Sequence, residues 1–80
     1  MTTSIRTATQ LGALMLARRQ ALGLSQQDVA SRLGISQNRL SELERNPERL
    51  TIERLLAYAN LLGLELVLQS KATTQPPTEW

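Results

Sequence analysis

The amino-acid sequence predicts an all-α fold of about four short helices that ends in one short strand. Apolar residues recur three and four positions apart from Leu11 to Leu62, which is the spacing of helices with one buried face. Serine, threonine and glycine stand where these stretches begin and end, as expected of helix caps. From Leu64 onward every second residue is leucine, which is the pattern of a strand.

Length indicates one small domain. Eighty residues bury only about 60% of the unfolded surface, so a partner subunit would add stability. We predict that residues 1–69 form this domain. Residues 70–80 are polar, contain two prolines and are predicted to form a disordered tail.

Composition excludes several kinds of chemistry. The chain has no cysteine and no histidine, so disulfides, the usual zinc sites and nucleophiles of those two types are excluded. No apolar run approaches the roughly 20 residues of a membrane span. Residues 1–8 also lack the apolar core of a signal peptide, so we expect a cytoplasmic location.

The first helix is predicted to begin at about Thr7 and to end at Gly23. Thr7 and Gln10 have the spacing of a capping box, in which each side chain bonds the backbone of the other residue. Gly12 lies within this helix, where glycine costs about 1 kcal/mol relative to alanine. We therefore expect another backbone to approach Gly12 closely.

Two further helices joined by a tight turn are predicted within residues 24–44. Ser25 caps the first of them, with Asp28 completing a weak capping box, and Ser36 caps the second. Gly34, between them, suits the positive φ at which many helices end.

Apolar side chains predict how these two helices pack. Val29, Ala30 and Leu33 share one face of the first helix, and Leu40 and Leu43 share one face of the second. Ala30 is small where the two helices would cross, so a larger side chain there should separate them. Two capped helices that meet at a glycine turn in this way define a helix-turn-helix.

The outward face of the second helix carries the candidate binding chemistry. Gln37, Asn38 and Ser41 lie together near its start, away from the Leu40 and Leu43 face. Glutamine and asparagine can form paired hydrogen bonds with an adenine edge, and the major groove admits a helix that enters by its N-terminus. We interpret this face as reading DNA bases; the alternative is a merely solvated polar face.

The distribution of charge favours contact with phosphate. The net charge is only +2, but residues 1–41 carry five arginines against one aspartate, whereas residues 42–80 carry four basic residues against six glutamates. The basic half contains the predicted reading helix. Arg39, Arg45 and Arg49 are available for backbone phosphates. Gln26, beside the free N–H groups at a helix start, suits a phosphate oxygen.

Arg19 has two interpretations. It lies near the end of the first helix, where the helix dipole favours a cation, and could be a surface charge. Alternatively it pairs with Glu44, because both would lie at the inner ends of helices that meet. Such a pair would orient Arg19 towards the DNA backbone, so we include it among the predicted phosphate contacts.

The fourth helix is predicted to begin after the cap Thr51 and to stop at Gly63. The predicted core stripe of this helix comprises Ile52, Leu55, Leu56, Ala59 and Leu62. Tyr58 and Leu61 widen the stripe, which indicates either a dimer contact or a broad core face.

Leu64, Leu66 and Leu68 are predicted to lie in the short strand. The sequence offers no second strand, so the backbone groups of this one would stay unpaired. Pairing with the same strand of a twofold-related copy would satisfy them. Such a dimer would also set two reading helices about one DNA turn apart on a palindromic operator. The alternative is a frayed continuation of the helix.

Trp80 is the last residue of the chain and its one tryptophan. A large aromatic side chain buried in a partner's pocket is a common source of binding energy. We expect Trp80 to contact a protein partner; the alternative is an accidental terminal aromatic residue.

Residues 24–44 resemble the helix-turn-helix of lambdoid phage repressors, the Xre family, and the likeness covers roughly residues 9–62. With the strand-like residues 64–69 and a tail that ends in Glu79 and Trp80, the chain resembles more narrowly the HipB-type antitoxins of HipBA toxin–antitoxin modules. By position, the base-reading residues that this resemblance implies are Ser36, Gln37, Asn38 and Ser41. It also implies a phosphate contact at Gln26 and an internal ion pair between Arg19 and Glu44.

The resemblance implies a homodimer that binds palindromic operators and represses its own operon. It also implies a complex with a HipA-like serine/threonine kinase toxin, which the antitoxin neutralises. The family member compared carries lysine in place of Ser36 and a small apolar residue in place of Asn38, so the operator sequence cannot be transferred. The alternative is a stand-alone Xre-type repressor without a toxin.

Nothing in the sequence indicates an enzyme or a cofactor. It contains no glycine-rich phosphate loop and no pair of acidic residues in a plausible pocket. We therefore expect a binding protein without catalytic residues, metal or cofactor.

Overall fold

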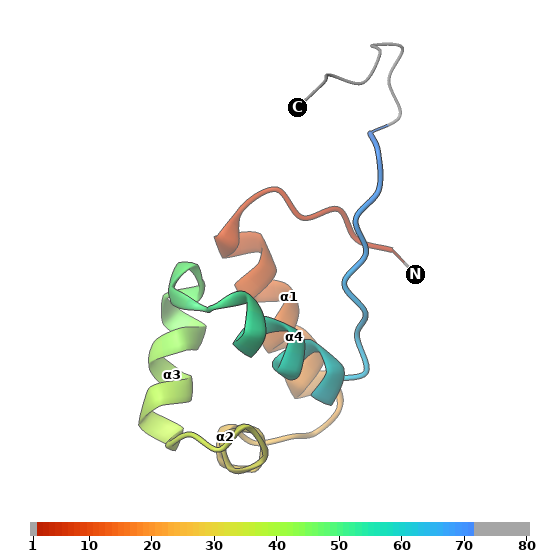
Figure 1. Ribbon diagram of the computed structural model, residues 1–80. Helices are drawn as coiled ribbons and strands as arrows, with labels where there is room; N and C mark the ends of the chain where they lie inside the picture. The colour runs from red at the N-terminus through yellow and green to blue at the C-terminus, as the bar shows by residue number, and fades with distance from the viewer. Residues whose placement is uncertain (1, 72–80) are drawn as a thin grey trace.

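The computed structural model describes residues 2–71, which form four α-helices and one 3₁₀ helix (Figure 1). The helices are α1 (Ala8–Ala21), α2 (Gln26–Leu33), α3 (Gln37–Arg45), η1 (Pro47–Arg49) and α4 (Ile52–Leu61). Residues 2–71 contain no strand. The predicted all-α fold of about four helices is confirmed.

The predicted caps explain where the helices begin. The four side chains that accept a backbone N–H bond at these positions are those of Thr7, Ser25, Ser36 and Thr51. The capping boxes predicted for Gln10 and Asp28 are both present. Gly34 has a φ of 74°, the left-handed conformation that the turn between α2 and α3 requires.

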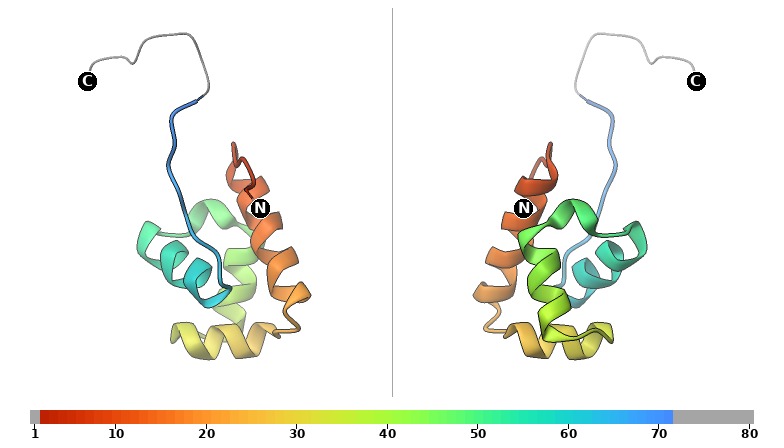
Figure 2. Two further views of the ribbon diagram at one scale, coloured as in Figure 1. Left: turned by 90° about the vertical axis from the view of Figure 1, so that its right-hand side faces the viewer. Right: turned by 90° about the vertical axis from the view of Figure 1, so that its left-hand side faces the viewer.

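The helices form a small bundle that α2 crosses at one end. This helix is seen end-on in Figure 1 and lengthwise in Figure 2. It packs against α3 and α4, whereas α1 contacts α3 and η1. The buried apolar side chains are those of Met15, Val29, Ala30, Leu40, Leu43, Leu55, Tyr58, Ala59 and Leu62. The predicted contact face between α2 and α3 thus lies in the core.

The buried face of α4 differs from the prediction. Ile52 and Leu56 are 66% and 43% exposed, whereas Tyr58 is only 2% exposed. These residues lie on opposite flanks of the stripe that Leu55 and Leu62 define, so helical periodicity alone cannot choose between them. Tyr58 turns inward because its hydroxyl group bonds Glu44 within the protein.

The segment after α4 turns back, passes alongside the helices and then extends beyond them (Figures 1 and 2). Leu64 packs against the core, but Leu66 and Leu68 are 48% and 94% exposed. The pairing of this segment with that of a second copy stays a prediction. Residues 72–80, which include Trp80 and nearly all of the predicted tail, lie outside the described residues.

Candidate nucleic-acid interface

The start of α3 presents the predicted base-reading side chains. Ser36, Gln37 and Asn38 are exposed and Ser41 is partly buried. The opposite face of α3 is fixed in the core, where Leu40 is fully buried. The helix is therefore held firmly while its first turn faces outward.

An open groove lies along this outward face of α3. Its lining residues are Ser36, Asn38, Arg39, Ser41, Glu42 and Arg45. Arg39 Nη1 lies 3.3 Å from Glu42 Oε1, and Arg45 Nη1 donates to Ser41 Oγ at 3.0 Å. Exposed pairs of this kind contribute only about 0–1 kcal/mol. Both guanidinium groups can therefore turn towards a bound phosphate at little cost.

Ser36 has a structural role beside its predicted reading role. Its Oγ accepts a hydrogen bond from the backbone N–H of Arg39 at 3.0 Å and so caps α3. A hydroxyl group has one proton to donate as well, and this proton remains available. The Ser36 hydroxyl group can thus cap the helix as an acceptor and, at the same time, donate its proton to a base.

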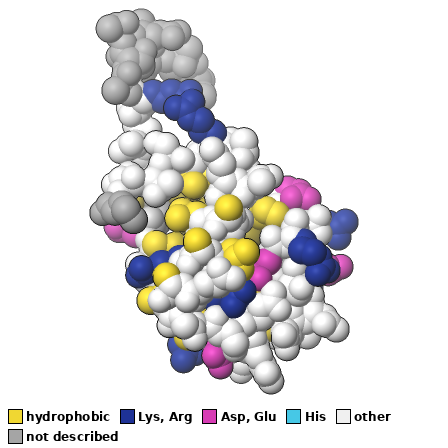
Figure 3. All heavy atoms as spheres, turned by 180° about the vertical axis from the view of Figure 1, so that it is seen from behind, with side chains coloured by type: hydrophobic (Ala, Val, Ile, Leu, Met, Phe, Trp, Pro, Cys, Tyr) yellow, Lys and Arg dark blue, Asp and Glu magenta, His cyan; other side chains and the backbone are white. Residues whose placement is uncertain are grey.

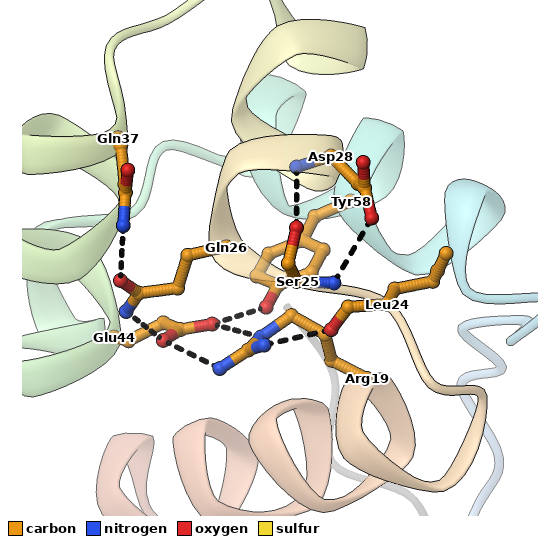
Figure 4. Close-up of polar contacts among 8 residues, drawn as sticks. All are labelled: Arg19, Leu24, Ser25, Gln26, Asp28, Gln37, Glu44 and Tyr58. Atoms are coloured by element: carbon orange, nitrogen blue, oxygen red, sulfur yellow. Dashed lines mark hydrogen bonds and ion pairs between the residues drawn. The ribbon is translucent and has the colours of Figure 1, made fainter.

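Four helices meet at the carboxylate of Glu44, near the end of α3 (Figure 4). Arg19 Nε of α1 donates to Oε2 at 2.9 Å, and Gln26 Nε2 of α2 donates to Oε1 at 2.8 Å. The Tyr58 hydroxyl of α4 donates to Oε2 at 2.7 Å. The side chains of Arg19 and Glu44 are 10% and 8% exposed, and the predicted ion pair between them is confirmed.

The hydrogen bonds keep this carboxylate ionised. Burial alone would raise the pKa of Glu44, but hydrogen bonds from Gln26, Tyr58 and Arg19 outweigh burial and lower this pKa below its ordinary value. Burial and the bond to Glu44 raise the pKa of Tyr58 far above its usual range. At neutral pH the network therefore contains a charged acceptor and a protonated phenol, which is a strong combination.

The Arg19 side chain is buried and forms its hydrogen bonds within the protein. Besides the two bonds to Glu44, its Nη1 donates to the backbone carbonyl of Leu24 at 2.8 Å. Only 8% of the residue is exposed. The predicted phosphate contact of Arg19 stays a prediction, and these bonds assign the guanidinium first of all a structural role.

Gln26 connects the buried network to the reading face. Its Nε2 donates to Glu44, and its Oε1 accepts a long hydrogen bond of 3.5 Å from Gln37 Nε2 (Figure 4). The amide of Gln37 keeps its oxygen and a second N–H free. An adenine edge needs one acceptor and one donor of this kind.

The sequence interpretation missed the role of Tyr58. It assigned this residue to the core or to a dimer contact, whereas the structure places its hydroxyl group on Glu44. A signal was present, because a buried tyrosine hydroxyl group usually requires a hydrogen-bond partner. Glu44 is the internal carboxylate that the sequence predicts.

The positive charges are distributed over several surfaces. On the face seen in Figure 3, basic and acidic side chains are interspersed with exposed apolar ones. Two arginines bond helix ends: Arg18 Nε donates to the carbonyl of Leu62 at 2.9 Å, and Arg54 Nη1 donates to that of Leu33 at 2.9 Å. These two guanidinium groups therefore stabilise the fold.

The family of the chain follows from comparison with known proteins. The helix-turn-helix model HTH_3 matches residues 15–69. The chain belongs to this helix-turn-helix family, and residues 15–69 are a DNA-binding domain of that class. A search of curated proteins gives no match.

Within this class, the solved structures that resemble the chain include HipB. A crystal form of a HipB–O1–O2 complex is 30% identical with a TM-score of 0.78, and the match covers 86% of this chain and 100% of that one. A HipA–HipB–O2–O3 complex gives the same identity and TM-score, with 86% and 97% covered. A structure named MDT protein is 30% identical with a TM-score of 0.79, and 90% and 100% are covered. The resemblance to HipB-type proteins is confirmed.

Residues 2–71 contain neither a candidate membrane span nor a candidate cluster of metal ligands. None of their helices is both long and apolar enough to cross a membrane. Over the same residues, no three acidic side chains come together as ligands for a metal ion.

Proposed function

We propose that this chain is a sequence-specific DNA-binding antitoxin that represses its own operon as a homodimer. The observation that carries the proposal is the exposed first turn of α3, whose Gln37 amide is supported from behind by Gln26 and Glu44. The 3.5 Å bond to Gln26 favours one orientation of the Gln37 amide before binding, so less entropy is lost on binding. A merely solvated face would not require such support.

Base reading and phosphate contact are assigned to different side chains. Gln37, Asn38 and Ser41 point outward from the start of α3 and read base edges in the major groove, with Ser36 beside them. Gln26, Arg39 and Arg45 lie around them and bind phosphate, which fixes the register of the helix on the duplex. The exposure of both arginines supports this division.

The homodimer is proposed to form through residues 64–69. Leu66, Val67 and Leu68 are 48%, 63% and 94% exposed in the single chain. An extended segment with exposed apolar side chains and free backbone groups is a ready partner for a second strand. A twofold pair of such strands would present two copies of α3 to a palindromic operator.

The protein partner is proposed to be a HipA-like kinase toxin. One resembling structure is a complex of HipA with HipB, and the match covers 97% of that chain. Trp80 is the proposed anchor on the toxin, because a tryptophan side chain can fill a pocket of the partner. Binding of the toxin by the antitoxin would neutralise the kinase.

Two experiments test these proposals separately. Selection of duplexes from a random library by the full chain should enrich a palindromic sequence; no enrichment would overturn operator binding. A pull-down from the native cytoplasm should retain a kinase, and a chain without residues 78–80 should lose it. Enrichment of an operator without a retained kinase would indicate a stand-alone repressor.

A further inference from the structure

We propose that Tyr58 is a positioning residue for DNA reading, although it lies in the core on α4. Its hydroxyl group fixes the carboxylate of Glu44, which fixes the amide of Gln26 and, through it, that of Gln37. This inference rests on the proposed reading of operator DNA by α3. It adds a residue outside the helix-turn-helix to those that determine sequence preference.

Hydrogen bonds occupy every acceptor position of the Glu44 carboxylate. A carboxylate offers about four acceptor positions, two on each oxygen. Oε2 accepts from Arg19 Nε at 2.9 Å and from the Tyr58 hydroxyl at 2.7 Å. Oε1 accepts from Gln26 Nε2 at 2.8 Å and from Arg19 Nη2 at 3.4 Å. All four positions are occupied, so the carboxylate has one preferred orientation.

The ion pair between Arg19 and Glu44 is asymmetric. Arginine and a carboxylate favour two parallel hydrogen bonds of similar length. Here the bonds from Arg19 to Glu44 measure 2.9 and 3.4 Å, and the Tyr58 bond is the shortest to this carboxylate. Without the hydroxyl group, the carboxylate can rotate towards a symmetric pair with Arg19. That rotation would move Oε1 away from Gln26.

The orientation of the Glu44 carboxylate determines that of the two amides that lead to the reading face. Gln26 Nε2 takes its orientation from Oε1 of Glu44, and Gln26 Oε1 accepts the 3.5 Å bond from Gln37. That last bond is long and therefore weak, so it persists only while Gln26 is held in place. Loss of the Tyr58 hydroxyl group should release the Gln37 amide, whose orientation decides which base edge it can bond.

The test is the substitution Tyr58→Phe in the full chain, which removes the hydroxyl group and keeps the ring. Dissociation constants are measured at one salt concentration for the duplex that the unaltered chain selects and for a scrambled duplex of equal length. We expect roughly two- to tenfold weaker binding to the selected duplex, the range for one neutral hydrogen bond, because the released Gln37 amide loses part of its contact with the base. Binding to the scrambled duplex should weaken less, because only the phosphate contact proposed for Gln26 is affected there.

A matched control distinguishes the loss of the hydrogen bond to Glu44 from a general loss of core packing. Leu55→Val removes one methylene group from the core of the same helix without a hydrogen bond to Glu44. It should leave the ratio of the two dissociation constants unchanged. An equal change of this ratio in both variants, or no change in Tyr58→Phe, would overturn the inference.

A double variant tests the route through Gln26. In a chain that already carries Gln26→Ala, Tyr58→Phe should cause no further loss of preference for the selected duplex. Independent losses that add would overturn the proposed route. If the unaltered chain prefers no duplex, the proposed function itself fails and this inference fails with it; a preference that Tyr58→Phe leaves intact contradicts only the inference.

Discussion

Gly12 of α1 lies directly against the ring of Pro47. A Cβ atom on Gly12 would stand 2.7 Å from Cγ and 3.0 Å from Cβ of that ring. Pro47 opens η1, which packs on α1 immediately after the reading helix α3 ends. The close approach predicted for Gly12 is confirmed, although a proline ring and not a backbone supplies it.

We predict that Gly12→Ala destabilises the fold by about 1 kcal/mol. Alanine would gain about 1 kcal/mol of helix propensity, but overpacking against a rigid ring costs roughly 1–3 kcal/mol. The free energy of unfolding from urea titration measures the balance. In a Pro47→Gly background both of these ring atoms are gone, so Gly12→Ala should become stabilising. A gain in stability from Gly12→Ala alone would contradict the contact.

Glu44 should make stability depend on pH. Hydrogen bonds lower its pKa in the folded protein below the ordinary value, so the ionised form stabilises the fold at neutral pH. As the pH falls through the ordinary range of a glutamate, the unfolded chain takes up the proton first, and this contribution is lost as the pH passes through the lower pKa of the folded protein. We predict that the free energy of unfolding falls from pH 7 to pH 3.

The matched variant Glu44→Gln isolates this contribution. It should be less stable at pH 7 and should lose less stability on acidification than the unaltered chain. Asp28, whose pKa is lowered by hydrogen bonds from the backbone and side chain of Ser25, titrates in both proteins and cancels in the comparison. Equal losses in the two proteins would show that Glu44 has no such role.

Leu66→Lys should weaken the proposed dimer. If residues 64–69 pair across a twofold axis, this change places a charge among the leucines of the apolar face, which is costly. Sedimentation should then show dissociation at concentrations where the unaltered chain is dimeric. Gln69→Lys adds the same charge on the other face of the strand and should leave the dimer intact. An unchanged dimer in both variants would rule out strand pairing.

The sequence predicted the helices well because their ends are decided locally. Ser25, Ser36 and Thr51 each bond the backbone three residues further on, so spacing alone identifies them. The 3₁₀ helix at Pro47 was not predicted, because a proline after a helix is compatible with several turns.

The candidate site was predicted less completely than the fold. Spacing along α3 predicted that Gln37 and Asn38 lie on its outward face, and both residues are exposed in the structure. The network behind that face joins residues 14 to 25 positions apart in sequence, as in the Tyr58–Glu44 and Arg19–Glu44 bonds. Such bonds depend on how helices pack, and helical periodicity could not decide between Tyr58 and Leu56 for the core.

Gln37 is the residue through which α3 is proposed to read base sequence. The most direct test compares Gln37→Ala with the unaltered chain on the selected duplex and on a scrambled duplex at one salt concentration. Loss of a paired contact to a base should cost about 1–3 kcal/mol on the selected duplex and almost nothing on the scrambled one. Arg39→Ala, a phosphate contact, should weaken both. Equal weakening of both duplexes by Gln37→Ala, or no weakening of either, would contradict the claim.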